Sequence, residues 1–192
     1  MMKNFKQIYF YTVLLVTTCL LFSCSKDDDS ANDVASVTIE DGRISFEISG
    51  YENATMESEV VYFLNNQYDI KYLTISNDEA ILYNDAVWHI SFDQNSNDEI
   101  ALPEPGEYPL VQGWSNTYDQ TSFNATISVW TDTMTETGVT FGGNVGAVNG
   151  TLTIVSNTDE IIKGTFSFEA FSSNGEKITV TNGQFAAPKY AW

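Results

Sequence analysis

The residues whose spacing could hold a metal ion lie in one acidic stretch in the middle of the chain. Positions 1, 3, 5 and 12 of a calcium-binding spacing are filled by Asp93, Asn95, Asn97 and Glu104. Calcium takes carboxylate and amide oxygens that a tight loop delivers at alternate positions. Position 6 is Asp98, where such loops turn on a glycine, and Pro103 precedes Glu104, so a polar loop between two strands is the better interpretation.

The only histidine, His89, lies between the apolar residues Trp88 and Ile90. A Ser-His-Asp triad would have to use it, but no Gly-x-Ser-x-Gly turn accompanies it. One histidine also cannot supply a multi-histidine zinc site. We therefore expect a structural or surface histidine on a strand.

Paired carboxylates could hydrolyse a glycosidic bond. With 26 acidic residues, some pair fits any spacing, so the sequence singles out none. We expect a protein that is not an enzyme, with a hydrolase as the least supported alternative.

Two aromatic residues, Trp114 and Tyr118, flank the polar run Ser115-Asn116-Thr117. Aromatic rings beside amides and hydroxyls suit the apolar face and the hydroxyl edge of a sugar, and exposed aromatic rings commonly mark a binding surface. The alternative is that both rings pack into the core, as most aromatic side chains do.

The residue with the clearest chemistry is Cys24, at the end of a leader. Lys3 and Lys6 precede an apolar run over residues 8–22, which is too short for a stable membrane span. A positive start, a short apolar run and a small residue before the cut indicate a secretory signal over residues 1–23. Leu21-Phe22-Ser23-Cys24 resembles a bacterial lipobox, which implies acylation of Cys24 and a stable membrane anchor.

Two alternatives to this anchor remain. Cys19 is a rival lipidation site, but the residue before it is Thr18, and cutting there would expose Leu20-Leu21-Phe22. The other alternative is ordinary secretion, in which the leader is cut elsewhere and the cysteine is not lipidated. Cys24 fits the pattern better than either.

The five residues after the cysteine have the composition of an export signal. They are Ser25, Lys26, Asp27, Asp28 and Asp29, and they resemble the lipoprotein export signal of the Bacteroidota. That resemblance implies the outer face of the outer membrane. A solvated charged tether over residues 24–33 is compatible with it.

The net charge of the 169 residues after the leader limits the kinds of partner that they can bind. The leader holds two of the eight basic residues and none of the acidic ones, which leaves a net charge of 6 − 26 = −20. Nucleic acid requires Lys and Arg at its phosphates, so we expect no nucleic-acid partner. Cys24 is also the only cysteine left, so disulfides cannot hold the domain together.

From Val34 to Trp192 the pattern predicts a single all-β domain, an antiparallel β-sandwich or β-barrel. Apolar and polar residues alternate over five runs, which is typical of half-buried strands: residues 43–49, 125–130, 151–155, 165–170 and 177–181. Turn chemistry occurs at Asp41-Gly42, Asn149-Gly150 and Asn174-Gly175, the last being the best hairpin. Asn182-Gly183 fits a bulge as well as a turn.

The second half of the chain contains four β-rich runs, Gly106–Leu110, Gly150–Ile154, Ile162–Ala170 and Val180–Phe185. Together these runs resemble a family of β-rich Bacteroidota lipoprotein domains of unknown function. The resemblance implies a class but no activity. Phe166 and Phe168 should be core, and Gly164 and Gly183 should permit close approach.

Asp29-Ser30-Ala31 and Asp132-Thr133-Met134 resemble the O-glycosylation pattern of the same bacteria, which would place glycans on Ser30 and Thr133. The sequence thus favours a lipoprotein of the outer membrane that binds an extracellular ligand, with a glycan as one candidate. A structural or adhesive envelope protein that acts through protein contacts is the alternative.

Overall fold

The chain folds into β-strands, as the alternating pattern predicts. A computed structural model describes residues 36–67, 70–77, 88–132 and 137–191, and Val34–Trp192 forms a compact unit. The strands are β1 (Arg43–Ser49), β2 (Ala54–Glu59), β3 (Val61–Gln67), β4 (Ile70–Ser76), β5 (Trp88–Ser96), β6 (Gly106–Val111), β7 (Phe123–Asp132), β8 (Thr137–Gly142), β9 (Val148–Asn157), β10 (Ile161–Phe171) and β11 (Lys177–Pro188).

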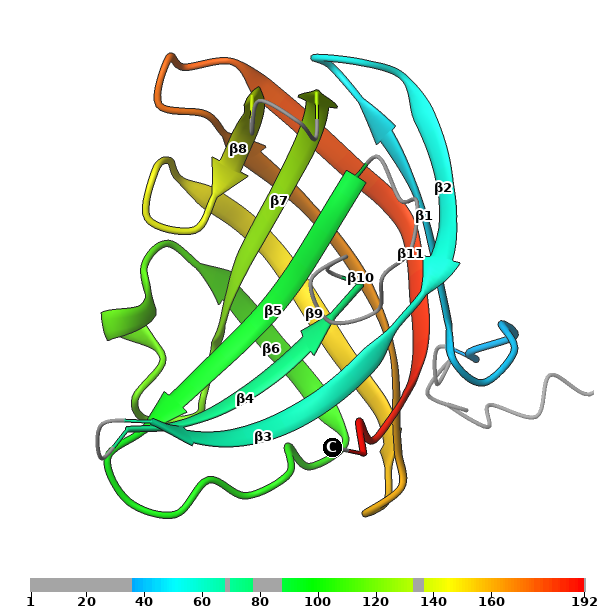
Figure 1. Cartoon of the computed structure of the whole chain (residues 1–192), viewed down its shortest axis with the longest axis vertical. Coiled ribbons are helices and arrows are strands. Elements are labelled where there is room, and N and C mark those ends of the chain that lie inside the picture. Colours follow the sequence, from blue (N-terminus) through cyan, green and yellow to red (C-terminus); the bar gives the residue numbers. More distant parts are fainter. Residues whose placement is uncertain (1–35, 68–69, 78–87, 133–136, 192) are drawn as a thin grey trace, which may run out of the picture. The chain divides into compact units, whose positions relative to one another are not determined.

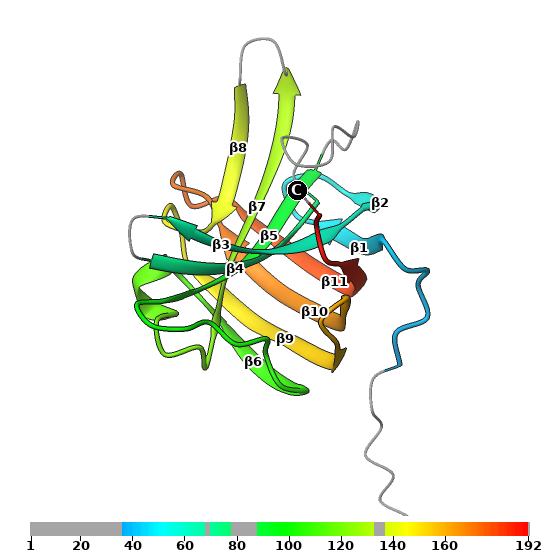
Figure 2. The same ribbon diagram turned by 60° about the horizontal axis from the view of Figure 1, so that its bottom comes forward.

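All of these strands belong to one sheet that curls into a nearly closed barrel (Figure 1). The order is β2-β1-β11-β10-β9-β6-β7-β5-β4-β3, and β8 pairs with β7. Figure 2 shows β7 and β8 reaching beyond the neighbouring strands. The predicted all-β class is therefore confirmed.

The ends of the sheet meet because β2 and β3 are almost one strand. Only Val60 separates them, yet β2 pairs with β1 and β3 pairs with β4. The bend is held by Val60 N, which donates to Gly42 O at 3.0 Å. Beyond β11, Tyr190 N donates to Tyr62 O at 2.7 Å and tightens the closure.

The weakest seam of the sheet lies between β6 and β7. These neighbours are parallel, and only two pairs of residues are in register: Leu110 opposite Phe123, and Val111 opposite Asn124. Parallel neighbours cannot be joined by a tight hairpin, so the chain must cross over between them. The crossing segment, residues 112–122, carries both Trp114 and Tyr118.

The interior is filled by phenylalanine rings from opposite walls. Phe166 of β10 lies 4.9 Å from Phe92 of β5 and 5.9 Å from Phe46 of β1, measured between ring centroids. Phe168 and Phe185 join the same cluster. The prediction that Phe166 and Phe168 are core is confirmed, and β5 and β10 face each other across the barrel.

The predicted turns had mixed outcomes. Asn174-Gly175 does join β10 to β11, with Gly175 at φ 82°. Asn182 adopts φ 53° at the register shift opposite Phe166, so Asn182-Gly183 is a bulge. The turn predicted at Asn149-Gly150 is wrong, because both residues lie inside β9. Gly150 is needed there for close packing, since a Cβ would come within 2.2 Å of a carbonyl on β10.

Glycine also permits close approach at the other two predicted positions. A Cβ at Gly164 would lie 2.7 Å from the Phe185 ring, and one at Gly183 would lie 2.4 Å from the Phe166 ring. Real Cβ atoms cannot come so near, so any larger residue would push the core rings aside. The described part of the chain contains no helix with the length and hydropathy needed to cross a membrane.

Candidate ligand-binding site

The loop between β6 and β7 presents the exposed aromatic rings that the sequence singles out. Trp114 is 40% exposed and Tyr118 is 37% exposed, among the few large apolar side chains described as exposed. A short 3-10 turn, Trp114–Asn116, forms the tip of the loop. Gly113, at φ 80°, begins the turn, and its N–H donates to Gly143 O at 2.8 Å.

The backbone of Trp114 is held rigidly although its ring is exposed. Its carbonyl oxygen accepts hydrogen bonds from Asn95 Nδ2 at 2.9 Å, Thr117 Oγ1 at 2.8 Å and Thr117 N at 3.1 Å. The indole also packs edge-on against Tyr72 of β4, with ring centroids 5.4 Å apart. We call Tyr72, Trp114 and Tyr118 the aromatic corner.

Two neighbouring amides at the end of β5 support the loop from below. Gln94 Nε2 donates to Gln120 O at 3.0 Å and to Ser122 O at 3.1 Å. Together with Asn95, it ties both arms of the loop to one strand. Their amide nitrogens are used in this way, and the loop is therefore pre-organised before any ligand arrives.

The same amides leave acceptors buried under the aromatic corner. Within the described residues, no donor reaches Gln94 Oε1 or Asn95 Oδ1, although each residue is only 1% exposed. A buried acceptor without a donor costs about 1–3 kcal/mol. Both oxygens are closed to solvent, so a ligand on the surface of the loop does not reach them.

The four residues with calcium-loop spacing do not lie in one loop, because two of them belong to a strand. Asp93 and Asn95 lie within β5, while Asn97 and Glu104 are exposed beyond its end. Asp93 is already engaged: its carboxylate accepts from Thr74 Oγ1 at 2.6 Å and from Ser91 Oγ at 3.0 Å. The described residues contain no group of three His, Cys, Asp or Glu that could hold a metal ion. Calcium binding here stays a prediction.

Burial gives Asp93 unusual electrostatics. Its removal from water raises the pKa to about 6, against the two hydroxyl donors, which lower it. No second carboxylate contributes to the shift. A catalytic carboxylate pair works because each acid perturbs the other or because their environments differ across a cleft. For Asp93, burial is the cause that raises the pKa.

His89 lies on the outer face of β5, opposite in direction to Trp88 and Ile90 as predicted, and is 7% exposed. Asp93 is four residues along the same face. At about 3.3 Å per residue, the two are roughly 13 Å apart along the strand. That separation is too large for the His–Asp contact of a catalytic triad.

The remaining predicted sites lie outside the described residues. They are Cys24, the export residues Ser25, Lys26, Asp27, Asp28 and Asp29, and the two glycosylation acceptors Ser30 and Thr133.

Two members of the site escaped the sequence reasoning. Tyr72 could have been found, because Leu73 and Ile75 alternate with it and predict an outward ring. Asn95 was selected for its oxygen as a calcium ligand, whereas its nitrogen holds the Trp114 loop. Comparison with family models, curated proteins and solved structures found no match to this chain.

Proposed function

We propose that this chain is a lipid-anchored protein of the bacterial outer membrane, exposed at the cell surface, whose barrel binds an extracellular glycan at the aromatic corner. Binding is its whole activity, and no reaction is catalysed. The anchor is the acylated Cys24, reached through the acidic tether that follows it.

The observation that carries the binding proposal is an exposed Trp114 whose backbone cannot move freely. Three hydrogen bonds hold its carbonyl, and the indole packs edge-on against Tyr72. An aromatic face of this kind offers apolar contact to one side of a sugar ring. Because the ring is already ordered, a ligand loses little entropy on binding it.

Neighbouring polar groups supply the other half of sugar recognition. Asn116 is exposed on the same turn, and Gln112 is exposed at the start of the same loop. Sugar hydroxyls both donate and accept, so they can pair with amide groups of either kind. The combination of ring and amides favours a glycan over a purely apolar ligand.

The other two candidate functions have weaker support. An adhesive protein that docks through apolar contacts needs a contiguous apolar patch, whereas the large apolar side chains described as exposed are Leu64, Trp114, Tyr118 and Val145. A hydrolase would need two cooperating acids, and the pKa of Asp93 is shifted by burial without a carboxylate partner.

A glycan array tests the binding site. The soluble domain, residues 34–192, is suitable because the paired strands and the core lie within it. We expect the wild-type domain to bind at least one glycan and Trp114→Ala to lose that signal. Val145→Ala is the matched control, since Val145 is 43% exposed but belongs to another loop. A blank array, or equal binding by Trp114→Ala, would refute the site.

The anchor has its own test in the full-length chain. Cys24→Ser should move the protein from the membrane fraction to the soluble fraction, because no acyl chain can attach. Surface exposure is checked separately by protease treatment of intact cells. Retention of an acylated Cys24→Ser protein in the membrane would contradict the lipidation proposal.

A further inference from the structure

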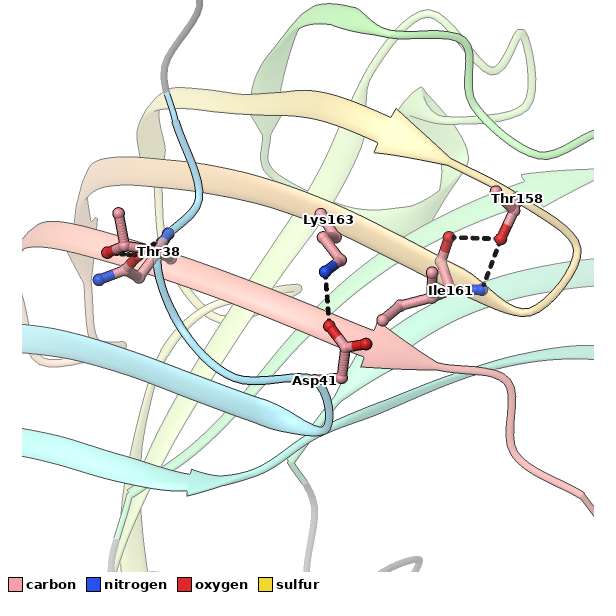
Figure 3. A network of polar contacts seen from close by, with 6 residues as sticks. Thr38, Asp41, Thr158, Ile161 and Lys163 are labelled. Atoms are coloured by element: carbon pink, nitrogen blue, oxygen red, sulfur yellow. Dashed lines mark hydrogen bonds and ion pairs between the residues drawn. The ribbon is translucent and has the colours of Figure 1, made fainter.

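The outer face of β9, β10 and β11 carries a shallow groove, widely open to solvent, with a volume of about 490 Å³. One wall is the segment that precedes β1, residues 36–41, which we call the strap. Figure 3 shows the strap running across β11, with Thr38 over that strand and Asp41 reaching Lys163 of β10. Ligand sites commonly have volumes of roughly 300–1,000 Å³.

The floor of the groove is a regular grid of hydroxyl and amide groups. Thr153, Thr165 and Gln184 are register partners across the three strands, and Thr151 and Ser167 form the next row. Adjacent strands lie about 4.8 Å apart, and residues on one face of a strand repeat every 6.6 Å or so. The grid therefore offers several hydrogen-bonding groups at the spacing of an extended polar ligand.

The strap is fixed in place by the floor itself. Gln184 Oε1 accepts from Thr38 N at 3.1 Å and from Thr38 Oγ1 at 3.2 Å. The ion pair between Lys163 Nζ and Asp41 Oδ1, at 2.5 Å, holds the other end. No described residue accepts from Gln184 Nε2, which leaves that group able to donate to a ligand.

The charge of the groove indicates what it would bind. The described residues that line it are neutral, with Thr, Ser, Asn and Gln side chains predominating, although the chain carries a net charge of −18. Asp41 of the strap and Lys163 of β10 border the groove but neutralise each other in an ion pair, so an anionic ligand finds no unpaired cation among the lining residues. A neutral ligand rich in hydroxyl groups matches the lining.

We propose that this groove is a second binding site, specific for a neutral oligosaccharide. It is separate from the aromatic corner, because β10 and β5 face each other across the core. The groove proposal does not depend on the aromatic corner. Binding in the groove should be weaker than at the aromatic corner, because hydroxyl groups gain little net free energy when they exchange water for a ligand.

Nuclear magnetic resonance can locate such binding directly. The ¹⁵N-labelled domain, residues 34–192, is titrated to 10 mM with cellohexaose, maltohexaose and mannohexaose, and with hexagalacturonate as a charged comparison. We expect one neutral hexasaccharide to shift the amide signals of residues 36–38, 151–153, 165–167 and 182–184. Hexagalacturonate should leave them unchanged.

Variants separate the groove from the aromatic corner. Thr165→Val and Ser167→Ala each remove a hydroxyl while keeping the strand, and each should weaken groove binding about threefold to tenfold, the value of one neutral hydrogen bond. Thr55→Val, an exposed threonine on β2, is the matched control. Trp114→Ala should leave the groove shifts intact.

Three results would overturn the groove proposal. They are no groove shift with any neutral hexasaccharide, an equal response to hexagalacturonate, and unchanged affinity in both Thr165→Val and Ser167→Ala. Circular dichroism of each variant confirms that a lost shift reflects the missing hydroxyl and not unfolding. If Trp114→Ala loses binding on the glycan array and the wild-type domain shows no groove shift, the aromatic corner is supported and the groove is not.

Discussion

The two facing walls of the barrel share one pattern but differ in what their outer faces do. Along β4, β5 and β7, outward polar side chains are buried: Asp93 is 5% exposed, Asn95 1% and Asn124 not at all. Along β9, β10 and β11, the outward residues Thr151 and Ser167 are exposed to solvent. Both walls alternate apolar and polar residues.

Loops explain the difference. The residue 112–122 loop lies over Asn95, and Asn124 Nδ2 donates to Val111 O at 3.0 Å at the entrance to that loop. A Cβ on Gly143 would lie 2.6 Å from Thr126 Oγ1, so the turn after β8 also lies close to this wall. On the opposite wall, the strap crosses the strands (Figure 3). Polar residues thus support a loop on the covered wall and meet solvent in the groove of the open wall.

The largest effect should come from a residue that serves both walls. Phe166→Ala removes the ring that contacts Phe92 and Phe46 in the shared core. Truncating a buried phenylalanine costs about 3–5 kcal/mol of the free energy of unfolding. Urea denaturation measures it, and a cost below 1 kcal/mol would contradict a common core.

The covered wall should also make stability depend on pH. Burial raises the pKa of Asp93 from 3.8 to about 6, so the native state binds its proton more tightly than the unfolded state does. The free energy of unfolding should therefore fall as pH rises from about 4 to 6, by at most about 3 kcal/mol.

Asp93→Asn removes that titration. We expect it to be more stable than wild type at pH 8, with the difference shrinking by pH 4, where the wild-type carboxyl is protonated. Urea unfolding at both pH values measures the difference. An advantage of equal size at pH 4 and pH 8 would show that the charge of Asp93 is not the cause.

A matched pair of substitutions sharpens the contrast between the walls. Asn124→Ala, on the covered wall, loses its hydrogen bond to Val111 O and should cost about 1–3 kcal/mol. Thr151→Ala, on the open wall, should change stability by no more than about 0.5 kcal/mol. Thermal melts of both variants test this. Equal costs would remove the distinction.

The smallest effect expected is that of calcium removal. The Asp93 carboxylate accepts from two hydroxyl groups, the Asn95 oxygen is closed to solvent, and Asn97 and Glu104 lie beyond the strand. Chelation with EGTA should therefore leave the melting temperature unchanged. A fall that added calcium reverses would establish the metal site and alter the role given to Asp93.

Periodicity predicted the strands well because the half-buried walls obey it. The run Arg43–Ser49 coincides with β1, and the runs 165–170 and 177–181 fall inside β10 and β11. The polar neighbours of Trp114 left open whether its ring is exposed or packed in the core, and the structure shows it exposed.

What failed were features set by tertiary contact. Asn149-Gly150 has the composition of a turn, but its glycine is required by the carbonyl of Ser167, which is distant in the sequence. The calcium spacing stays a prediction, but the sequence did not show that Asp93 accepts from Thr74 or that Asn95 donates to Trp114 O. The groove was not foreseen, because its rows join residues from three strands and a strap.

The most direct test of the account is one titration repeated on three proteins. The ¹⁵N-labelled domain in wild-type, Trp114→Ala and Thr165→Val forms is titrated with the neutral hexasaccharides and followed by amide shifts. The account predicts two groups of shifts in wild type, in the 112–122 loop and in the groove. Trp114→Ala should lose only the first group and Thr165→Val should weaken only the second. Shifts that vanish together in either variant, or appear in neither region, would contradict it.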